Sequence, residues 1–178
     1  MVLVILARIN HHISSRFTGL KKILNKEDSV TISNYLDERL IVFLDEETRD
    51  GAIACLIEQL DLSGVLFNKS EFHDAILDRE RIVSTGIGIG VAIPHAKMSE
   101  CSDFFIAVGI QKNKGLDWNA LDGSLVRLIF MIGGPDNKQT EYLKILSHLT
   151  QSIKDEERRK KLLKCTSVPE VLDLFIGC

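Results

Sequence analysis

The sequence predicts an α/β fold: a single domain in which a mixed β-sheet of about five strands is flanked by helices on both faces. Two observations predict it. Short apolar runs alternate along the chain with longer segments whose apolar residues recur at helical spacing, which is typical of a sheet covered by helices on both sides. The length of 178 residues fits one domain, and a hydrophobic content of 45% is enough for a substantial core.

The first half of the chain supplies one strand and two helices. Residues 39–44 form a short apolar run bounded by charge, which predicts a buried strand. Thr48 and the acidic residues before it are typical of a helix start, and residues 49–61 carry apolar side chains at helical spacing. Ser70 is expected to cap a second helix over about 71–80.

Two further strands are predicted in the second half. Residues 104–110 and 125–132 are continuous apolar runs, and the second is the strongest strand signal in the chain. The Gly-Gly-Pro sequence at 133–135 is expected to stop that strand, because proline donates no ladder hydrogen bond. Residues 116–123, which include Trp118, are expected to form a loop or short hairpin.

The C-terminal part is predicted to be helical. Residues 142–153 repeat apolar side chains at helical spacing, with Asn137 or Thr140 as the expected cap. Residues 155–164 carry acids first and bases last, which suits the dipole of a helix. A Ser-x-x-Glu capping box opens a last helix over about 168–176.

Residues 84–97 hold the most distinctive pattern, Ser-Thr-Gly-Ile-Gly-Ile-Gly-Val-Ala-Ile-Pro-His-Ala-Lys. Glycines at every second position permit a tight turn or the close approach of a charged ligand. Residues 91–93 predict a short buried strand, which Pro94 ends. We therefore expect a rigidly presented His95 imidazole beside a loop whose N–H groups are free to bind an anion.

This pattern resembles the active-site signature of the fructose/mannitol class of enzyme IIA, a module of the bacterial phosphoenolpyruvate-dependent phosphotransferase system. Arg79 matches a further family feature, Arg-x-x-x-x-Ser-Thr-Gly. The resemblance extends more thinly from about Leu24 to the C-terminus and is closest to the stand-alone, nitrogen-related (PtsN-like) branch. It implies the enzyme IIA fold for a phosphocarrier domain over residues 21–178. Residues 1–20 lie outside it and are expected to be a poorly ordered extension or an extra element.

The resemblance implies that His95 accepts a phosphoryl group from a phosphohistidine carrier protein. A IIB partner would then receive the group, or it would remain as a regulatory mark, so the chain is expected to be a phosphotransferase component with a phosphohistidine intermediate. A neutral imidazole suits this role because it is nucleophilic near pH 7. Arg79, Ser84 and Thr85 are expected to act with His95, since an anionic group in transfer needs cations and hydrogen-bond donors. Ser84 and Thr85 also fit a turn that caps its own backbone, and Arg79 fits a helix C-terminal cation.

Other residues are candidates for contacting the phosphoryl group: Gly86, Gly88 and Tyr142. Many members of the family carry a second histidine where Tyr142 stands in this chain. A tyrosine hydroxyl could still donate a hydrogen bond, but it cannot supply a cation near neutral pH. The alternative for Tyr142 is a side chain that faces the core, and His148 is expected to be a surface residue on a different face of the same helix.

A separate set of residues is expected to face partner proteins: Ile87, Ile89, Lys97 and Met98. The apolar members of this set are equally compatible with an ordinary core.

Several classes of function are excluded by what the sequence lacks. A net charge of −3 does not favour nucleic acid binding. The glycines do not match a dinucleotide fingerprint and there is no Walker A motif, so no cofactor is expected. Four cysteines without a Cys-x-x-Cys pair indicate free thiols in a cytoplasmic protein and no metal, and adjacent His11 and His12 do not form a ligand pair. The apolar run at 2–7 is too short to span a membrane.

Two other functions remain compatible with the sequence. One is a regulatory binding module that changes partners with the phosphorylation of His95 and delivers little or no phosphate onward. The other is a small-molecule binding domain that has lost phosphotransfer, which the missing second histidine favours and the intact signature opposes.

Overall fold

The computed structural model describes residues 30–178. The expected extension at 1–20 and the pair His11 and His12 lie outside this range, so their predictions remain untested.

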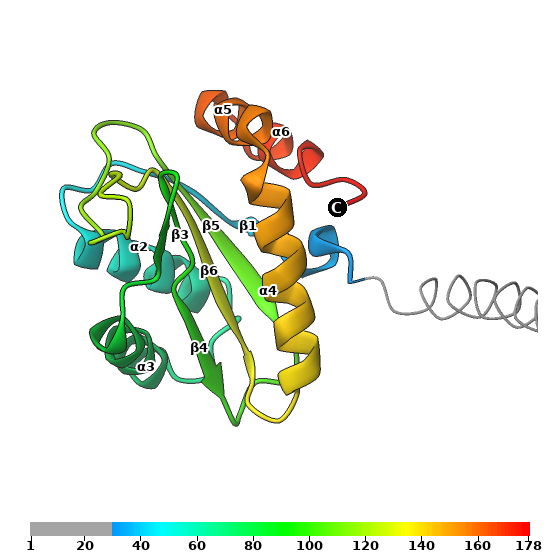
Figure 1. Cartoon of the computed structure of the whole chain (residues 1–178). Helices are drawn as coiled ribbons and strands as arrows, with labels where there is room; N and C mark the ends of the chain where they lie inside the picture. Colours follow the sequence, from blue (N-terminus) through cyan, green and yellow to red (C-terminus); the bar gives the residue numbers. More distant parts are fainter. Residues whose placement is uncertain (1–29) are drawn as a thin grey trace, which may run out of the picture. The chain divides into compact units, whose positions relative to one another are not determined.

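The described chain contains both strands and helices, as the sequence predicts; a first 3-10 turn is followed by one strand, two helices, five strands and three helices (Figure 1). In chain order the elements are η1 Ile32–Tyr35, β1 Leu36–Leu44, α2 Arg49–Leu62, α3 Lys69–Ile82, β2 Gly86–Gly88, β3 Val91–Ala92, β4 His95–Met98, β5 Phe105–Gln111, β6 Leu128–Pro135, α4 Gln139–Lys154, α5 Glu156–Lys164 and α6 Val168–Asp173.

The six strands form one mixed sheet in the order β1-β5-β6-β3-β2, and β4 also pairs with β6. The β5–β6 and β2–β3 pairs are antiparallel, while β1–β5, β3–β6 and β4–β6 are parallel. The predicted mixed sheet is therefore confirmed, with one strand more than expected. β3 and β4 lie end to end along the same edge of β6, and Pro94 stands between them.

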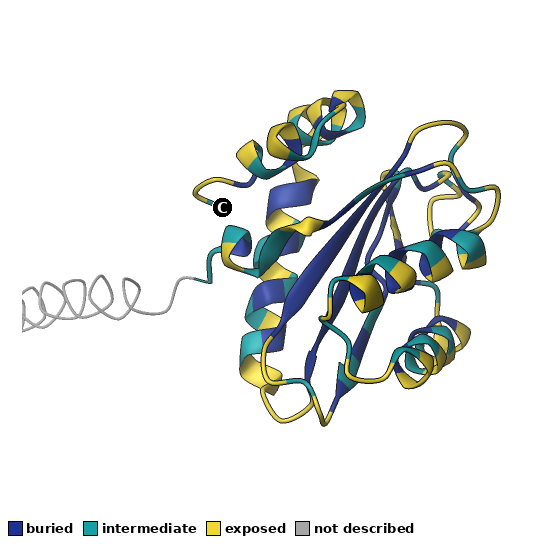
Figure 2. Ribbon diagram, turned by 180° about the vertical axis from the view of Figure 1, so that it is seen from behind, coloured by how far each residue is buried: buried dark blue, intermediate teal, exposed yellow. Residues whose placement is uncertain are grey.

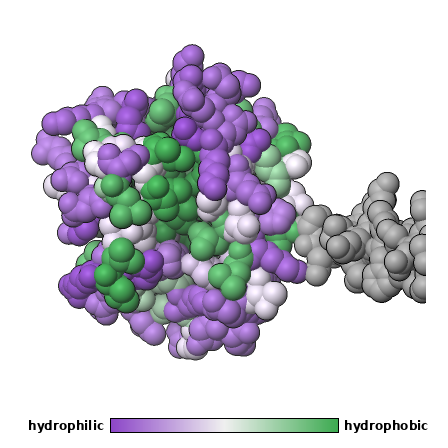
Figure 3. All heavy atoms as spheres, in the orientation of Figure 1, coloured by the Kyte–Doolittle hydropathy of each residue, from purple (hydrophilic) through white to green (hydrophobic). Residues whose placement is uncertain are grey.

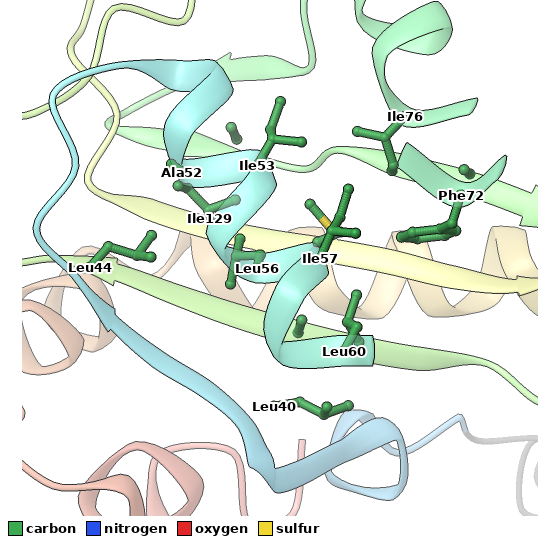
Figure 4. Close-up of a cluster of buried hydrophobic side chains, with 14 of the residues drawn as sticks. Leu40, Leu44, Ala52, Ile53, Leu56, Ile57, Leu60, Phe72, Ile76 and Ile129 are labelled. Carbon is green, nitrogen blue, oxygen red and sulfur yellow. The ribbon is translucent and has the colours of Figure 1, made fainter. Parts of the chain in front are cut away.

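Helices cover both faces of the sheet, as predicted. α4 crosses one face in Figure 1, and α2 and α3 lie on the opposite face, which Figure 2 shows from behind. On the α2–α3 side, apolar side chains from β1, α2, α3 and β6 meet in one cluster (Figure 4). The labelled members of this cluster are Leu40, Leu44, Ala52, Ile53, Leu56, Ile57, Leu60, Phe72, Ile76 and Ile129.

Strand periodicity explains how one sequence fills both faces. Along β6, Ile129 and Met131 belong to the cluster under α2 and α3. The intervening Phe130 points to the other face, where its ring lies 6.0 Å from that of Phe175. All eight residues of β6 are buried, which is why this strand gives a continuous apolar run in the sequence and not an alternating one.

Three helix boundaries predicted from the sequence are wrong. α3 begins at Lys69 and is capped by Asn68, whose side chain accepts from the backbone N–H of Glu71, so Ser70 is not the cap. The helix also continues to Ile82, which places Arg79 within its last turn. Neither Asn137 nor Thr140 caps α4, since its N-cap position is Lys138 and no side chain there bonds to the backbone.

The glycine pair does not stop β6, which continues to Pro135. A Cβ on Gly133 would lie 2.1 Å from the ring of Phe105, and one on Gly134 would lie 2.0 Å from the ring of Phe104. The glycines therefore make room for two aromatic rings that cross the strand.

The segment after Pro94 forms a further strand, β4, which was not predicted from the sequence. β4 pairs with β6 from His95 to Met98, and its side chains alternate between half-buried and buried. The polar side chains of His95 and Lys97 hide this alternation in the sequence.

Candidate functional site

His95 is the first residue of β4 and follows Pro94 directly. The Pro94 carbonyl accepts a hydrogen bond from the backbone N–H of Ile132 at 2.9 Å, and His95 pairs with Ile132 across the β4–β6 ladder. The histidine backbone is therefore fixed by the central part of the sheet, as a site on a rigid element requires.

Both ring nitrogens of His95 have partners. Nδ1 lies 2.9 Å from the carbonyl oxygen of Ile93, and Nε2 lies 3.0 Å from Nε of Arg79. A carbonyl oxygen only accepts and a guanidinium nitrogen only donates. Nδ1 therefore carries the proton and Nε2 carries the lone pair, which defines a single neutral tautomer.

The surroundings of His95 favour its neutral form. Burial is the largest cause that lowers the pKa of the imidazole, and the positive charges of Arg79 and Lys97 lower it further. The hydrogen bond with Ile93 and the negative charge of Glu80 act in the opposite direction without reversing the shift. Protonation would also place two donors, Nε2–H and the Arg79 Nε–H, against each other.

An open groove of about 450 Å³ lies beside His95. Side chains from α3, β4 and α4 line it: Ala75, Asp78, Arg79, Ile82, His95, Ala96, Lys97 and Tyr142. The structure thus brings together His95, Arg79, Lys97 and Tyr142, four of the residues singled out in the sequence, from three separate elements.

Arg79 reaches the groove from the last turn of α3. Its Nε–H donates to His95, and Nη1 donates to the carbonyl of Val83 at 2.9 Å. The second bond ties the guanidinium to the residue that ends the helix. Arg79 is therefore held against the imidazole, so its role extends beyond that of a helix C-terminal cation.

Tyr142 lies at the start of α4 and is buried. Its ring centroid is 5.7 Å from that of His95 and 6.2 Å from that of Phe104, and the Lys97 ammonium lies 4.4 Å from the ring centroid. Burial raises the pKa of its hydroxyl group. Tyr142 therefore contributes a neutral wall to the groove, and it also positions the cation of Lys97, which hydrogen-bonds to Gln139.

Ser84 and Thr85 do not contact the imidazole directly. The Ser84 hydroxyl donates to the carbonyl of Trp118 and accepts from the N–H of Gly86. The Thr85 hydroxyl is buried and donates to the Glu80 carboxylate. These residues stabilise the loop between α3 and β2, and Ser84 caps its own turn as considered from the sequence. Their expected action with His95 stays a prediction.

Glu80 is a site residue that the sequence reasoning missed. It is only 6% exposed, and its carboxylate accepts hydrogen bonds from Thr85 and from the indole N–H of Trp118. Phe72, Ile76 and Glu80 follow one another at intervals of four, which places them on one face of α3. That spacing was the signal that could have identified Glu80 as buried.

The glycine turn is not a free anion-binding loop. The N–H groups of Ile89 and Gly90 donate to the side chains of Asp122 and Ser124. A hydrogen bond from the Ser124 side chain, followed by bonds from the backbone N–H groups of Ile89 and Ser124, lowers the pKa of Asp122 to about 2. Gly88 pairs with Val91 opposite Leu128, four residues along β6 from the position opposite His95. At about 3.3 Å per residue this register places Gly88, and Gly86 one row nearer, away from His95 along the sheet, and neither lines the groove. Their expected role as phosphate contacts stays a prediction.

The expected partner-facing residues divide into two groups. Met98 is 7% exposed and belongs to the core cluster, so that prediction was wrong. Ile87 and Ile89 are exposed, as a partner contact requires. The sequence reasoning missed Ile82 and Val83, which are 79% and 55% exposed beside Arg79. Figure 3 shows hydrophobic atoms on this face close to where α3 leads into β2.

Residues 34–177 match the family model of the phosphoenolpyruvate-dependent sugar phosphotransferase system, EIIA 2. The chain belongs to this family. The match spans the sheet, the groove and the glycine turn together, so the family expected from residues 84–97 is confirmed.

Curated relatives come from sugar transport and from nitrogen regulation. The chain is 36% identical over 132 residues to the fructose-specific EIIABC component of Bacillus subtilis, which covers 74% of this chain but only 21% of that protein. It is 35% identical to the fructose-specific EIIA component of Haloferax volcanii, covering 72% of this chain and 82% of that protein. A nitrogen regulatory protein homolog of Haemophilus influenzae is 33% identical, and the match covers 57% of this chain and 63% of that protein.

Solved structures share the fold. The nitrogen regulatory protein IIA-Ntr of Neisseria meningitidis superposes with a TM-score of 0.76 at 24% identity, covering 82% of this chain and 99% of that chain. Enzyme IIAMTL of Escherichia coli, solved in complex with phosphorylated enzyme IIBMTL, gives a TM-score of 0.67 at 25% identity, covering 80% and 99%.

Two further properties concern residues 30–178 alone. None of their helices combines the length and apolar character needed to cross a membrane. Their His, Cys, Asp and Glu side chains form no group of three or more that could hold a metal ion.

Proposed function

We propose that this chain is a phosphocarrier in which Nε2 of His95 accepts a phosphoryl group from the phosphohistidine of a carrier protein. The group then passes to an enzyme IIB partner or remains as a regulatory mark. One observation carries the proposal: His95 is held as a single neutral tautomer whose lone pair, on Nε2, lies beside the Arg79 guanidinium at an open groove.

In the transfer, the Nε2 lone pair forms a bond to phosphorus while the nitrogen–phosphorus bond of the donor breaks. The bonding electron pair leaves with the donor imidazole. The His95 ring gains positive charge as Nε2 becomes bonded, and the Ile93 carbonyl stabilises that charge through the proton on Nδ1. No metal is needed for this step, because the donor is a protein phosphohistidine and not a nucleotide.

Catalysis of such a transfer depends on positioning and on charge, because the transition state is loose. Arg79 Nε now occupies the position facing Nε2, so the incoming phosphoryl group displaces it. The guanidinium then bonds to phosphoryl oxygens, a geometry that its planar fork of donors fits. Lys97 adds a second positive charge at the same groove, while Tyr142 adds none.

The rim of the groove suits docking by another protein. Ile82 and Val83 lie beside Arg79, and Leu143 follows Tyr142 on α4; all three are exposed apolar side chains. Apolar contacts around a charged centre exclude water from the transfer. The complex of enzyme IIAMTL with phosphorylated enzyme IIBMTL supports a IIB protein as the receiving partner.

A regulatory module is the second candidate, and the likeness to nitrogen regulatory proteins favours it. A phosphoryl dianion on His95 would share the groove with the exposed Ile82, where it would oppose an apolar interface by desolvation and repulsion. The two functions share the first half-reaction and differ in whether phospho-His95 discharges to a IIB protein.

The test is the intact mass after the chain is mixed with phosphoenolpyruvate, the upstream enzyme and the carrier protein. We expect a gain of one acid-labile phosphoryl group in the wild type, no gain in His95→Ala, and a full gain in the control His148→Ala. Loss of the group on adding a IIB protein separates the carrier from the regulatory module. A gain in His95→Ala would move the site away from His95, and no gain in the wild type would leave only a binding module.

A further inference from the structure

We propose that Glu80 is a positioning residue for His95. Its buried carboxylate anchors the turn formed by Ser84 and Thr85, and through that turn it fixes the imidazole tautomer in which Nε2 carries the lone pair. That this tautomer serves to accept a phosphoryl group rests on the proposed function. That Glu80 fixes the tautomer does not depend on the proposed function.

The contacts of Glu80 are directed to one turn. Oε2 accepts from the Thr85 backbone N–H at 3.1 Å, and Oε1 accepts from the Thr85 hydroxyl and from the Trp118 indole N–H at 3.2 Å. The arginines on either side of Glu80 turn elsewhere, since Arg79 bonds to His95 and Arg81 bonds to Asp78. The carboxylate therefore balances hydrogen-bond donors in the core and not a neighbouring guanidinium.

A carboxylate is the group that fits this position. Three donors, two of them N–H groups that cannot turn round, converge on its two oxygens. A glutamine amide has one acceptor oxygen, so its NH₂ group would face either the Thr85 N–H or the Trp118 indole N–H. The indole would then keep only its other acceptor, the Thr85 hydroxyl oxygen at 3.2 Å. Burying a charge is costly unless it is fully hydrogen-bonded, so this arrangement holds the turn in one conformation.

A relay of backbone bonds connects the turn to the imidazole. The Thr85 carbonyl accepts from the N–H of Ile93 at 3.0 Å, and the Ile93 carbonyl accepts from Nδ1–H of His95 at 2.9 Å. The same turn is held from its other side by the bond between Ser84 and the Trp118 carbonyl. Displacing Thr85 would therefore displace the carbonyl that selects the proton position on His95.

The alternative tautomer shows what this positioning achieves. With the proton on Nε2, that N–H would face the Arg79 Nε–H, and Nδ1 would face the Ile93 carbonyl as a second acceptor. Neither pair could form a hydrogen bond. A loose Ile93 carbonyl would remove one of these two mismatches and leave Arg79 alone to oppose this form, in which Nε2 has no lone pair for phosphorus.

The experiment compares Glu80→Gln, Thr85→Val and their double variant. The tautomer of neutral His95 is measured by ¹⁵N NMR, and the initial rate of phosphoryl uptake is measured by mass. Thr85→Ser keeps the hydroxyl and serves as the conservative rescue. Ile76→Ala, a buried change on the same helix face outside the hydrogen-bonded relay, serves as a control for lost stability alone.

We expect the wild type and Thr85→Ser to show the Nδ1–H form. Glu80→Gln and Thr85→Val should each show a mixture of tautomers and a rate lowered about tenfold, the usual effect of losing a partner that orients a histidine. The double variant should be no slower than the slower single variant, because both remove the same anchor. Ile76→Ala should melt earlier and keep the wild-type tautomer and rate.

An unchanged tautomer in Glu80→Gln would overturn the proposal. A mixture of tautomers in Ile76→Ala would also overturn it. So would a roughly hundredfold loss of rate in the double variant, because the effects of the two single variants would then be additive. The NMR measurement needs no phosphoryl donor. If the wild type took up no phosphate, the proposed function would fail, and the tautomer would still decide the role of Glu80.

Discussion

The two ends of the segment 84–97 are neighbours in sequence and behave differently in the fold. At the His95 end, two cations, Arg79 and Lys97, line an open groove with a neutral imidazole. The acid among the lining residues, Asp78, is paired with Arg81. At the glycine end, the N–H groups of Ile89 and Gly90 are used by Asp122 and Ser124. One end is therefore arranged to receive an anion, and the other already holds an anion of its own chain.

This difference shows that glycine-rich sequence alone does not identify a phosphate site. The glycine turn needs positive φ angles, +85° at Gly88 and +76° at Gly90, and it holds even Ile89 at a φ of 54°. Such angles are costly for a β-branched residue, so the bond from Ile89 to Asp122 stabilises a strained turn. The glycines shape the hairpin that leads to β3, and β3 in turn leads to His95.

The largest expected effect is at the His95 end. Arg79→Ala should lower the rate of phosphoryl uptake about a hundredfold. This is the usual loss when an enzyme lacks one hydrogen-bond donor that stabilises negative charge in the transition state. Arg81→Ala, which removes an exposed arginine paired with Asp78 on the same helix, should leave the rate unchanged. Initial rates measured by intact mass decide the comparison, and equal losses in both variants would mean that only general charge matters.

The glycine end should respond in stability and not in rate. Gly88→Ala should lower the free energy of unfolding by about 2 kcal/mol, because the new Cβ would lie 2.8 Å from Asp122 at a positive φ. Gly64 also has a positive φ, +69°, but a Cβ there would meet nothing within 4 Å. Gly64→Ala should therefore lower the free energy of unfolding by only about 1 kcal/mol. Urea unfolding measures both. A folded Gly88→Ala that takes up phosphate much more slowly would place the glycine turn in the site after all.

The smallest expected effect is that of pH on His95. Its pKa is lowered, mainly by burial, with Arg79 and Lys97 adding to the shift. The folded state therefore stays neutral while the unfolded chain takes up its proton near pH 6.5. The uptake rate should stay constant as the pH falls through about 6.5 and decline only below the pKa of His95 in the folded state. The free energy of unfolding should fall as the pH drops from about 6.5 to that folded-state pKa, because the unfolded state binds more protons in this range.

NMR titration of the His95 ring measures this pKa directly. Arg79→Ala should raise the pKa, since it removes a positive neighbour. A wild-type value at or above that of an exposed histidine would contradict the buried, neutral imidazole.

Much of the fold could be predicted because its signals are local. The helical spacing at 49–61 and the apolar run at 39–44 correspond to α2 and β1 within a few residues. β4 could not be predicted, because half of its four residues point toward the groove and are polar. The continuation of β6 through Gly133 also depends on a ring from another strand, Phe105, which local sequence does not reveal.

The sequence by itself determined the family and the α/β fold, and it led to the proposal of His95 as the acceptor, since the signature and the periodic patterns that carry them are local in the chain. The sequence named Arg79 and Tyr142 as candidates, but only the tertiary structure decided that they contact that histidine. Arg79 lies sixteen residues away on a helix and Tyr142 lies on another, so only packing brings them to the ring. It also decided that Glu80 is buried and that Met98 belongs to the core, because burial depends on what the rest of the chain places over a residue and not on the residue's own type.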